Sequence, residues 1–168
     1  MTDQARDSLI LLSEHFTNSA AFQELFRDGM NLVEETAAYL DGDGRADAKT
    51  LERAVGLTYA TESMRLTTRL MQLASWLLLH RAVREGEMTL NQANREKTKV
   101  KLTAAEPGAT ELIEKLPEPL QALIARSMEL QTKVRRLDAT MHAEKADTGA
   151  PGNPLMPQLD RLRAAFEG

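Results

Sequence analysis

The three histidines of this chain are spread in a way that argues against metal binding. His15, His80 and His142 lie in different segments, and none stands four residues from another or in a Glu-x-x-His spacing. We therefore interpret them as surface or interfacial imidazoles. The chain contains no cysteine, which excludes thiolate metal sites, cysteine nucleophiles and a disulfide framework.

An acidic turn at residues 41–44, Asp-Gly-Asp-Gly, begins like a calcium loop, and Glu52 stands at its twelfth position. The fifth and sixth positions are Arg45 and Ala46, however, where such a loop needs an oxygen ligand and a glycine. We therefore interpret this turn as the end of a helix. The chain also lacks a glycine-rich phosphate loop and a Gly-x-Ser-x-Gly motif, so we expect neither an enzyme nor a cofactor.

The best candidate for a binding surface is a polar stripe in the middle of the chain. Glu62, Arg65 and Arg69 recur at helical spacing, and the only tryptophan, Trp76, continues the same face. An exposed tryptophan beside arginine is typical of a protein-interaction hot spot, so all four residues are candidate partner contacts that we expect to face water. One alternative, which composition alone favours, is an ordinary solvated helix face with a Glu–Arg pair. The other is that all four residues hold the bundle together.

A basic segment at residues 95–101 is the second candidate surface. Arg95, Lys97, Lys99 and Lys101 outnumber the single Glu96, although the whole chain has a net charge of −4. Such a segment could contact phosphates, which gives the alternative function of a DNA-associated regulator. It lacks interleaved aromatic residues, so a solvated connecting helix is the favoured interpretation.

The C-terminal residues form the third candidate. Residues 146–154 have the composition of a linker, rich in glycine, proline and alanine. After it, Leu155, Leu159, Leu162 and Phe166 repeat at amphipathic spacing in a segment too short to fold alone. This tail either docks on its own domain or folds on binding a partner, and its four apolar residues are candidate contacts.

Long helices must position these residues. No proline precedes Pro107, and apolar residues recur at three- and four-residue steps over residues 19–40 and from about residue 117 to 144. A third long helix is predicted over residues 49–84, ended by Gly86, and the capping-box pair Thr89 and Gln92 predicts a short helix up to about residue 100. One or two turns are predicted within residues 110–116.

The predicted fold is all-α: an antiparallel bundle of three long helices, with short connecting helices and a flexible C-terminal tail. The bundle domain comprises residues 1–145, and the linker and tail comprise residues 146–168.

The helix over residues 49–84 is apolar or small on more than half of its circumference. Beside a leucine stripe it carries a stripe of small residues and a third stripe that includes Met64 and Met71. So much apolar surface must be covered by two neighbours, or by one neighbour and a partner chain. A further possibility is a small-molecule pocket lined by Met64, Met71 and Leu78.

A long run in this helix resembles a known family. It reads YATESMRLTTRLMQLASWLLL from Tyr59 to Leu79 and is followed by RAV and GEM; similar pieces lie earlier, between Phe26 and Leu40. These residues are similar to those of the RcdA-like family, alphaproteobacterial regulators of CtrA degradation that were long grouped as a domain of unknown function. The resemblance covers roughly residues 16–100, and the tail is unmatched.

The resemblance implies a homodimeric helical bundle that is not an enzyme and acts as an adaptor in regulated proteolysis. In that family the implied partners are the ClpXP protease, response-regulator and cyclic-di-GMP-binding adaptors, and cell-cycle cargo such as CtrA. The residues themselves add that no apolar run approaches the ~20 residues of a membrane span and that the first residues do not resemble a secretory signal. We therefore expect a cytoplasmic protein with no membrane partner, and nucleic acid binding is disfavoured.

Overall fold

The structure is a computed structural model that describes residue 4 and residues 20–97, 110–149 and 156–166. The apolar residues 9–12, both Lys99 and Lys101 of the basic segment, and Leu155 of the tail lie outside the described residues.

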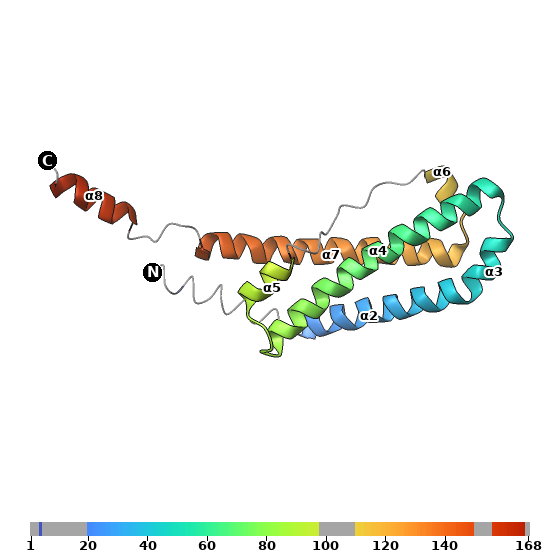
Figure 1. Ribbon diagram of the computed structural model, residues 1–168, viewed down its shortest axis with the longest axis horizontal. Helices are drawn as coiled ribbons and strands as arrows, with labels where there is room; N and C mark the ends of the chain where they lie inside the picture. The colour runs from blue at the N-terminus through green and yellow to red at the C-terminus, as the bar shows by residue number, and fades with distance from the viewer. Residues whose placement is uncertain (1–3, 5–19, 98–109, 150–155, 167–168) are drawn as a thin grey trace.

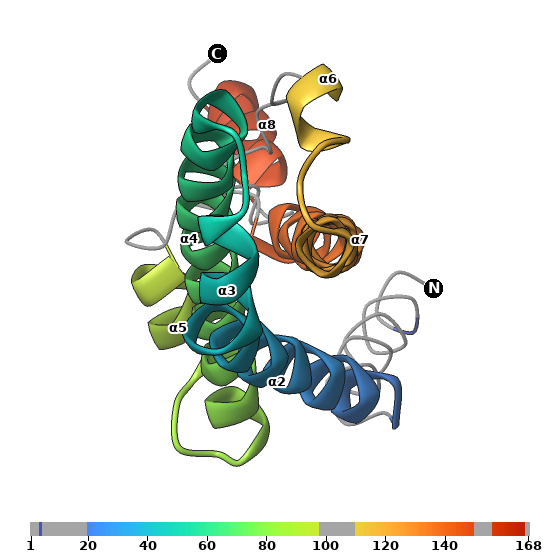
Figure 2. The same ribbon diagram turned by 90° about the vertical axis from the view of Figure 1, so that its right-hand side faces the viewer.

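The described residues form three long helices and four short ones (Figures 1 and 2). The long helices are α2 (Ala20–Asp41), α4 (Arg53–Arg84) and α7 (Glu118–Gly149). The short helices are α3 (Asp43–Lys49), α5 (Leu90–Lys97), α6 (Thr110–Ile113) and α8 (Met156–Phe166). The predicted all-α bundle of three long helices is therefore confirmed.

The direction of α7 differs in part from the expected antiparallel arrangement. Arg69 of α4 contacts Ser127 of α7, and Trp76, one heptad later, contacts Asp138 further along α7. Because the residue numbers rise together, α4 and α7 run parallel, while α2 runs antiparallel to both (Figure 1). The connection through α5 and α6 returns the chain to the end of the bundle at which α4 began.

Leucines that point between the three long helices make up most of the core. The fully or nearly fully buried hydrophobic residues of this cluster are Phe22, Leu32, Val55, Leu66, Leu70, Leu73, Trp76, Leu77, Leu116, Leu120, Leu123, Ile124, Leu130 and Val134. Gly29 allows α2 to come close to this layer, since a Cβ atom there would lie 2.5 Å from Leu77 Cδ1.

The predicted stop and start around residue 86 are both confirmed. Gly86 has φ +74° and follows the last residues of α4, and the amide of Glu87 donates to the carbonyl of Ala82 at 3.0 Å, a glycine-terminated C-cap. The Thr89 amide then donates to Gln92 Oε1 at 3.0 Å, and the Gln92 amide donates to Thr89 Oγ1 at 3.2 Å. This reciprocal pair is the predicted capping box at the start of α5.

Two helix boundaries differ from those predicted. Residues 50–52 separate α3 from α4, so α4 begins at Arg53 rather than near residue 49. The end of α5 predicted near residue 100 lies outside the described residues. α7 continues to Gly149, past the boundary predicted near residue 144, because no glycine or proline interrupts it earlier. Of the described helices, none combines the length and the apolar character that crossing a membrane requires.

Candidate functional site

The polar stripe of α4 lies inside the bundle, not on its surface. Glu62, Arg69 and Trp76 are each at most 6% exposed, so the expectation that they face water is wrong. Arg65 differs, because 38% of its side chain is exposed.

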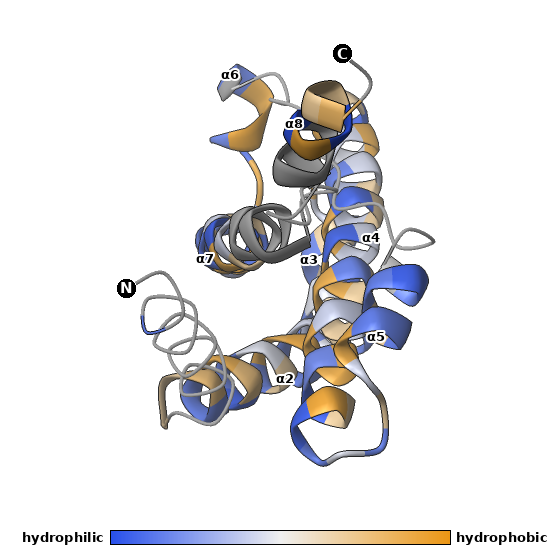
Figure 3. Ribbon diagram, turned by 90° about the vertical axis from the view of Figure 1, so that its left-hand side faces the viewer, coloured by the Kyte–Doolittle hydropathy of each residue, from blue (hydrophilic) through white to orange (hydrophobic). Residues whose placement is uncertain are grey.

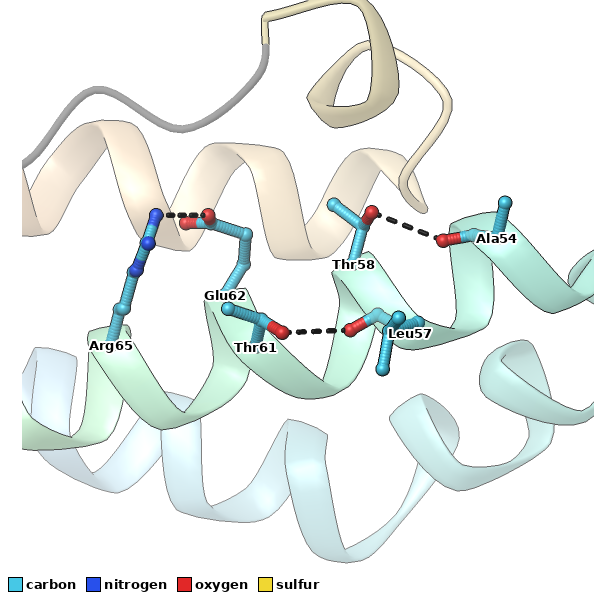
Figure 4. A network of polar contacts seen from close by, with 6 residues as sticks. All are labelled: Ala54, Leu57, Thr58, Thr61, Glu62 and Arg65. Atoms are coloured by element: carbon cyan, nitrogen blue, oxygen red, sulfur yellow. Dashed lines mark hydrogen bonds and ion pairs between the residues drawn. The ribbon is translucent and has the colours of Figure 1, made fainter.

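Buried Glu62 forms an ion pair with Arg65, which lies one turn later on α4. Arg65 Nη1 donates to Glu62 Oε1 at 3.0 Å, and the pair lies on the side of α4 that faces α7 (Figure 4). A buried carboxylate requires such a charged or hydrogen-bonding partner. The pair is therefore part of the α4–α7 contact, with only Arg65 reaching solvent.

Arg69 joins α4 to α7 through a buried hydrogen bond. Its Nη1 donates to Ser127 Oγ at 2.8 Å, and Ser127 Oγ donates to the Ile124 carbonyl at 2.7 Å. Burial lowers the pKa of the Arg69 guanidinium, and the nearby Glu62 carboxylate opposes that shift. The arginine thus serves as an internal link between two helices.

Trp76 makes the second polar link between these helices. Its indole Nε1 donates to Asp138 Oδ1 of α7 at 3.0 Å, and its ring lies 4.0 Å from that of His80, centroid to centroid. A buried tryptophan needs a partner for its N–H, which Asp138 supplies. Since α7 carries both Ser127 and Asp138, it covers this arc of α4, which is why three of the four predicted contacts are buried.

The opposite face of α4 is open. Leu57, Met64, Met71 and Leu78 are between 52% and 72% exposed, and we call these four residues the α4 stripe. They line neither of the two surface hollows that the described residues form, so the possibility of a small-molecule pocket lined by Met64, Met71 and Leu78 has no support in the described part of the chain. Helical spacing predicted that the apolar surface of this helix would be covered by two neighbours, or by one neighbour and a partner chain, and in the single chain these four residues are exposed.

The tail helix α8 is the other exposed apolar element. Phe166 is 86% exposed and Leu162 is also exposed, while Leu159 belongs to the same helix. α8 lies beyond the end of α7, away from the three-helix bundle (Figure 1). The structure therefore brings Leu162 and Phe166 nowhere near Glu62, Arg69 or Trp76.

The basic segment is only partly described. Arg95 is exposed on α5, and Lys97 is the last residue of that helix. Figure 3 shows α5 as largely hydrophilic on its ribbon, beside the mixed ribbon of α4. Ala93 is its one buried residue in the core, so α5 packs on the bundle through a small side chain and presents its polar face outward.

Within the described part of the chain, two surface hollows lie between helices. One, of about 240 Å³ between α2 and α7, is bordered by the ion pair of Arg126 with Glu35. The other, of about 470 Å³, lies where α2 begins and α4 ends, and there the Arg81 guanidinium sits 4.8 Å from the Phe26 ring centroid. In the part of the chain that is described, no group of three or more histidine, aspartate or glutamate residues could hold a metal ion.

The geometry defines a class of protein first: an all-α three-helix bundle in which buried Arg69 and Trp76 link α4 to α7, and in which a few large apolar side chains are exposed on α4 and α8. The chain belongs to the family described as "Protein of unknown function (DUF1465)", whose model matches residues 13–166. No curated protein matches it.

A solved structure is similar to this chain, that of RcdA from Caulobacter crescentus CB15. The two share 52% sequence identity with a TM-score of 0.63, over 76% of this chain and 96% of that chain. The resemblance identified from the run in α4 is thereby confirmed.

Proposed function

We propose that this protein is a non-enzymatic adaptor in regulated proteolysis, which helps deliver cell-cycle regulatory substrates to an AAA+ protease of the ClpXP type. The observation that carries the proposal is the 52% identity to RcdA over 96% of that chain. The exposed apolar residues of α4 and α8 support it, because contiguous apolar surface marks protein-interaction sites.

The tail is the surface we assign to partners. Leu155 precedes α8, and Leu159, Leu162 and Phe166 follow on α8 at amphipathic spacing. The side chains of Leu162 and Phe166 are exposed. Because α8 is tethered to the bundle, a partner bound to α8 has a raised effective concentration near a second partner bound to the bundle. Arg65, half-exposed on α4, is the one residue of the polar stripe that we keep as a contact.

The partners in this proposal are the protease, response-regulator and cyclic-di-GMP-binding adaptors, and a cargo such as CtrA. The adaptor works in the cytoplasm and as a homodimer, so each assembly offers two tails. Bivalent presentation strengthens weak contacts without any new interface.

A reconstituted degradation assay tests the proposal. CtrA is incubated with ClpXP, ATP and the two partner adaptors, with or without this chain, and we expect the chain to shorten the lifetime of CtrA. The variant Phe166→Glu should reduce this effect, whereas Ala164→Glu, a matched control on the same exposed helix, should retain it. An unchanged CtrA lifetime, together with salt-dependent binding of the chain to DNA, would overturn the proposal in favour of the DNA-associated alternative.

A further inference from the structure

A surface hollow at one end of the bundle combines aromatic side chains with positive charge. It lies where α2 begins and α4 ends (Figure 1), and we call it the α2–α4 hollow. Its volume of about 470 Å³ is within the range of ligand-binding clefts. None of its lining residues belongs to the α4 stripe or to α8. They are Phe22, Gln23 and Phe26 of α2, and Arg81, Arg84 and Glu85 at the end of α4.

Two phenylalanines of α2 supply the apolar surface of this hollow. Phe22 is 2% exposed, and its ring centroid lies 6.5 Å from that of partly buried Phe26. The Arg81 guanidinium lies over the Phe26 ring, 4.8 Å from its centroid, which is a cation–π contact. An apolar side chain that enters the hollow would therefore meet aromatic surface next to a fixed positive charge.

The two arginines of the hollow are only partly neutralised. Arg81 Nε donates to Glu85 Oε1 at 3.0 Å, but these side chains are 50% and 47% exposed, so their ion pair contributes little to stability. Arg84 donates to a neutral group instead. The Gln23 amide oxygen accepts from Arg84 Nη1 at 3.0 Å and Nη2 at 2.5 Å, in the amide orientation that satisfies both partners. Of the ion pairs between described residues, none includes Arg84.

The hydrogen-bond donors that α4 offers to this hollow are side chains, not backbone amides. The amides of Glu85 and Gly86 already donate to the carbonyls of Arg81 and Val83, at 2.9 and 3.2 Å. Backbone amides typically capture a free chain terminus, whereas clustered arginines recognise acidic side chains. Two arginines and one glutamate leave a net charge of +1, which matches one carboxylate better than a phosphoryl group with nearly two negative charges.

We propose that the α2–α4 hollow binds an acidic peptide segment of a partner protein, in which an aspartate or glutamate neighbours a large apolar side chain. The carboxylate pairs with Arg84, while the apolar side chain packs against the two phenylalanines. Glu85 competes with the carboxylate for Arg81 and so weakens the binding. The inference rests on the adaptor role of the proposed function, and it adds the chemistry of one bound segment and its place on the bundle.

Binding of short labelled peptides to the purified full chain is the first test. The peptides are blocked at both ends and carry glutamate or aspartate beside leucine, methionine or phenylalanine; in a matched set, glutamine or asparagine replaces the acid. We expect fluorescence anisotropy to show saturable binding of the acidic set and about tenfold weaker binding of the amide set, because a charged hydrogen bond is lost. Equal binding of both sets, or tighter binding of a phosphoserine set, would contradict the proposal.

Variants at the end of α4 test the site itself. Arg84→Gln should weaken binding of the acidic set about tenfold, and Arg84→Lys, which keeps the charge and loses the planar fork, should lie between this variant and the wild type. Glu85→Gln should strengthen binding about two- to fivefold, because it removes the competing carboxylate. Arg53→Gln removes the same charge at an exposed position at the other end of α4 and is the matched control, with unchanged binding.

A purely structural role of these side chains predicts a different pattern. Positive side chains stabilise the C-terminal end of a helix, so Arg84→Gln would then lower the unfolding midpoint and Glu85→Gln would raise it, with no change in peptide binding. That pattern would overturn the proposal. The absence of saturable binding to either peptide set would also overturn it, and would mean that residues 1–19 or a different partner fills the hollow.

These outcomes are separate from those of the degradation assay, because they need only the purified full chain and the peptides. A chain that shortens the lifetime of CtrA but binds no acidic peptide would refute the peptide site and leave the adaptor proposal standing. A chain that binds the acidic set with the expected effects of the variants, but leaves CtrA untouched, would do the reverse.

Discussion

The bond between Trp76 and Asp138 offers a quantitative test of the inward orientation of the polar stripe. Trp76→Phe removes the indole N–H and keeps an aromatic ring beside His80. A hydrogen bond to a charged group contributes about 1.5–3 kcal/mol, and the smaller ring adds a void, so we expect the free energy of unfolding to fall by about 2–4 kcal/mol. With a slope of about 2 kcal/mol per molar urea, the unfolding midpoint should shift by about 1–2 M.

A double-mutant cycle isolates the bond from the change in ring size. Trp76→Phe and Asp138→Ala are made singly and together, and urea unfolding is followed by far-ultraviolet circular dichroism at one fixed chain concentration. We expect the double variant to lose about 1.5–3 kcal/mol less than the sum of the single losses, because each single variant already removes the same bond. In the wild type, the emission of the only tryptophan should shift to the red in the same transition.

Lys133→Ala is the control for this cycle, because Lys133 lies on α7 with an exposed side chain. Its ion pair with Glu129 joins two exposed side chains one helical turn apart, so its loss should cost only a few tenths of a kcal/mol. Additive losses in the cycle, or a Trp76→Phe midpoint equal to that of the wild type, would refute the reasoning. An unchanged midpoint combined with lost partner binding would restore Trp76 as a contact residue.

Three further outcomes are expected. Gly86→Ala should lower the free energy of unfolding by about 1 kcal/mol, because Gly86 has a positive φ. Gly56→Ala should raise it by about 0.5–1 kcal/mol, because Gly56 lies in open space within α4. Urea titration compares the two variants, and equal effects would be inconsistent with the capping role of Gly86. Gly29→Ala should cost about 1–3 kcal/mol, measured in the same way, since its Cβ would press on buried Leu77, and a neutral effect would show that α2 can move away. The hydrogen bond from Arg126 of α7 lowers the pKa of Glu35, so the Glu35–Arg126 pair stabilises the fold at neutral pH and ceases to do so as the pH falls through the lowered pKa. The stability difference between wild type and Glu35→Gln should therefore disappear in acid, and a difference that persists there would contradict this assignment.

Local signals in the sequence predicted the helices well. The Thr89–Gln92 capping box and the glycine at residue 86 each depend on residues within one helical turn, so the stop of α4 and the start of α5 follow from the sequence alone. The direction of α7 could not follow in the same way. More than thirty residues join α4 to α7, a length that allows the chain either to turn back at once or to return along the bundle first.

The outward orientation expected for the polar stripe of α4 was the main error, and its cause is physical. The leucine stripe of α4 is bordered on one side by Glu62, Arg69 and Trp76 and on the other by small and methionine residues. Hydropathy places the first group outside, but burial depends on whether another helix supplies partners, and Ser127 and Asp138 of α7 do so. Those partners lie about sixty residues away in the chain, so no pattern within α4 could reveal them.

The two methionines at the centre of the α4 stripe make it sensitive to oxidation. Peroxide converts a methionine thioether into a polar sulfoxide, and Met64 and Met71 are 72% and 66% exposed in a single chain. Their rate of oxidation, followed by mass spectrometry, therefore reports how much of the α4 stripe is left uncovered. Once they are oxidised, the stripe becomes polar while the leucine core is unchanged, so the surface changes character without unfolding of the bundle. A sulfoxide reductase would restore the apolar surface.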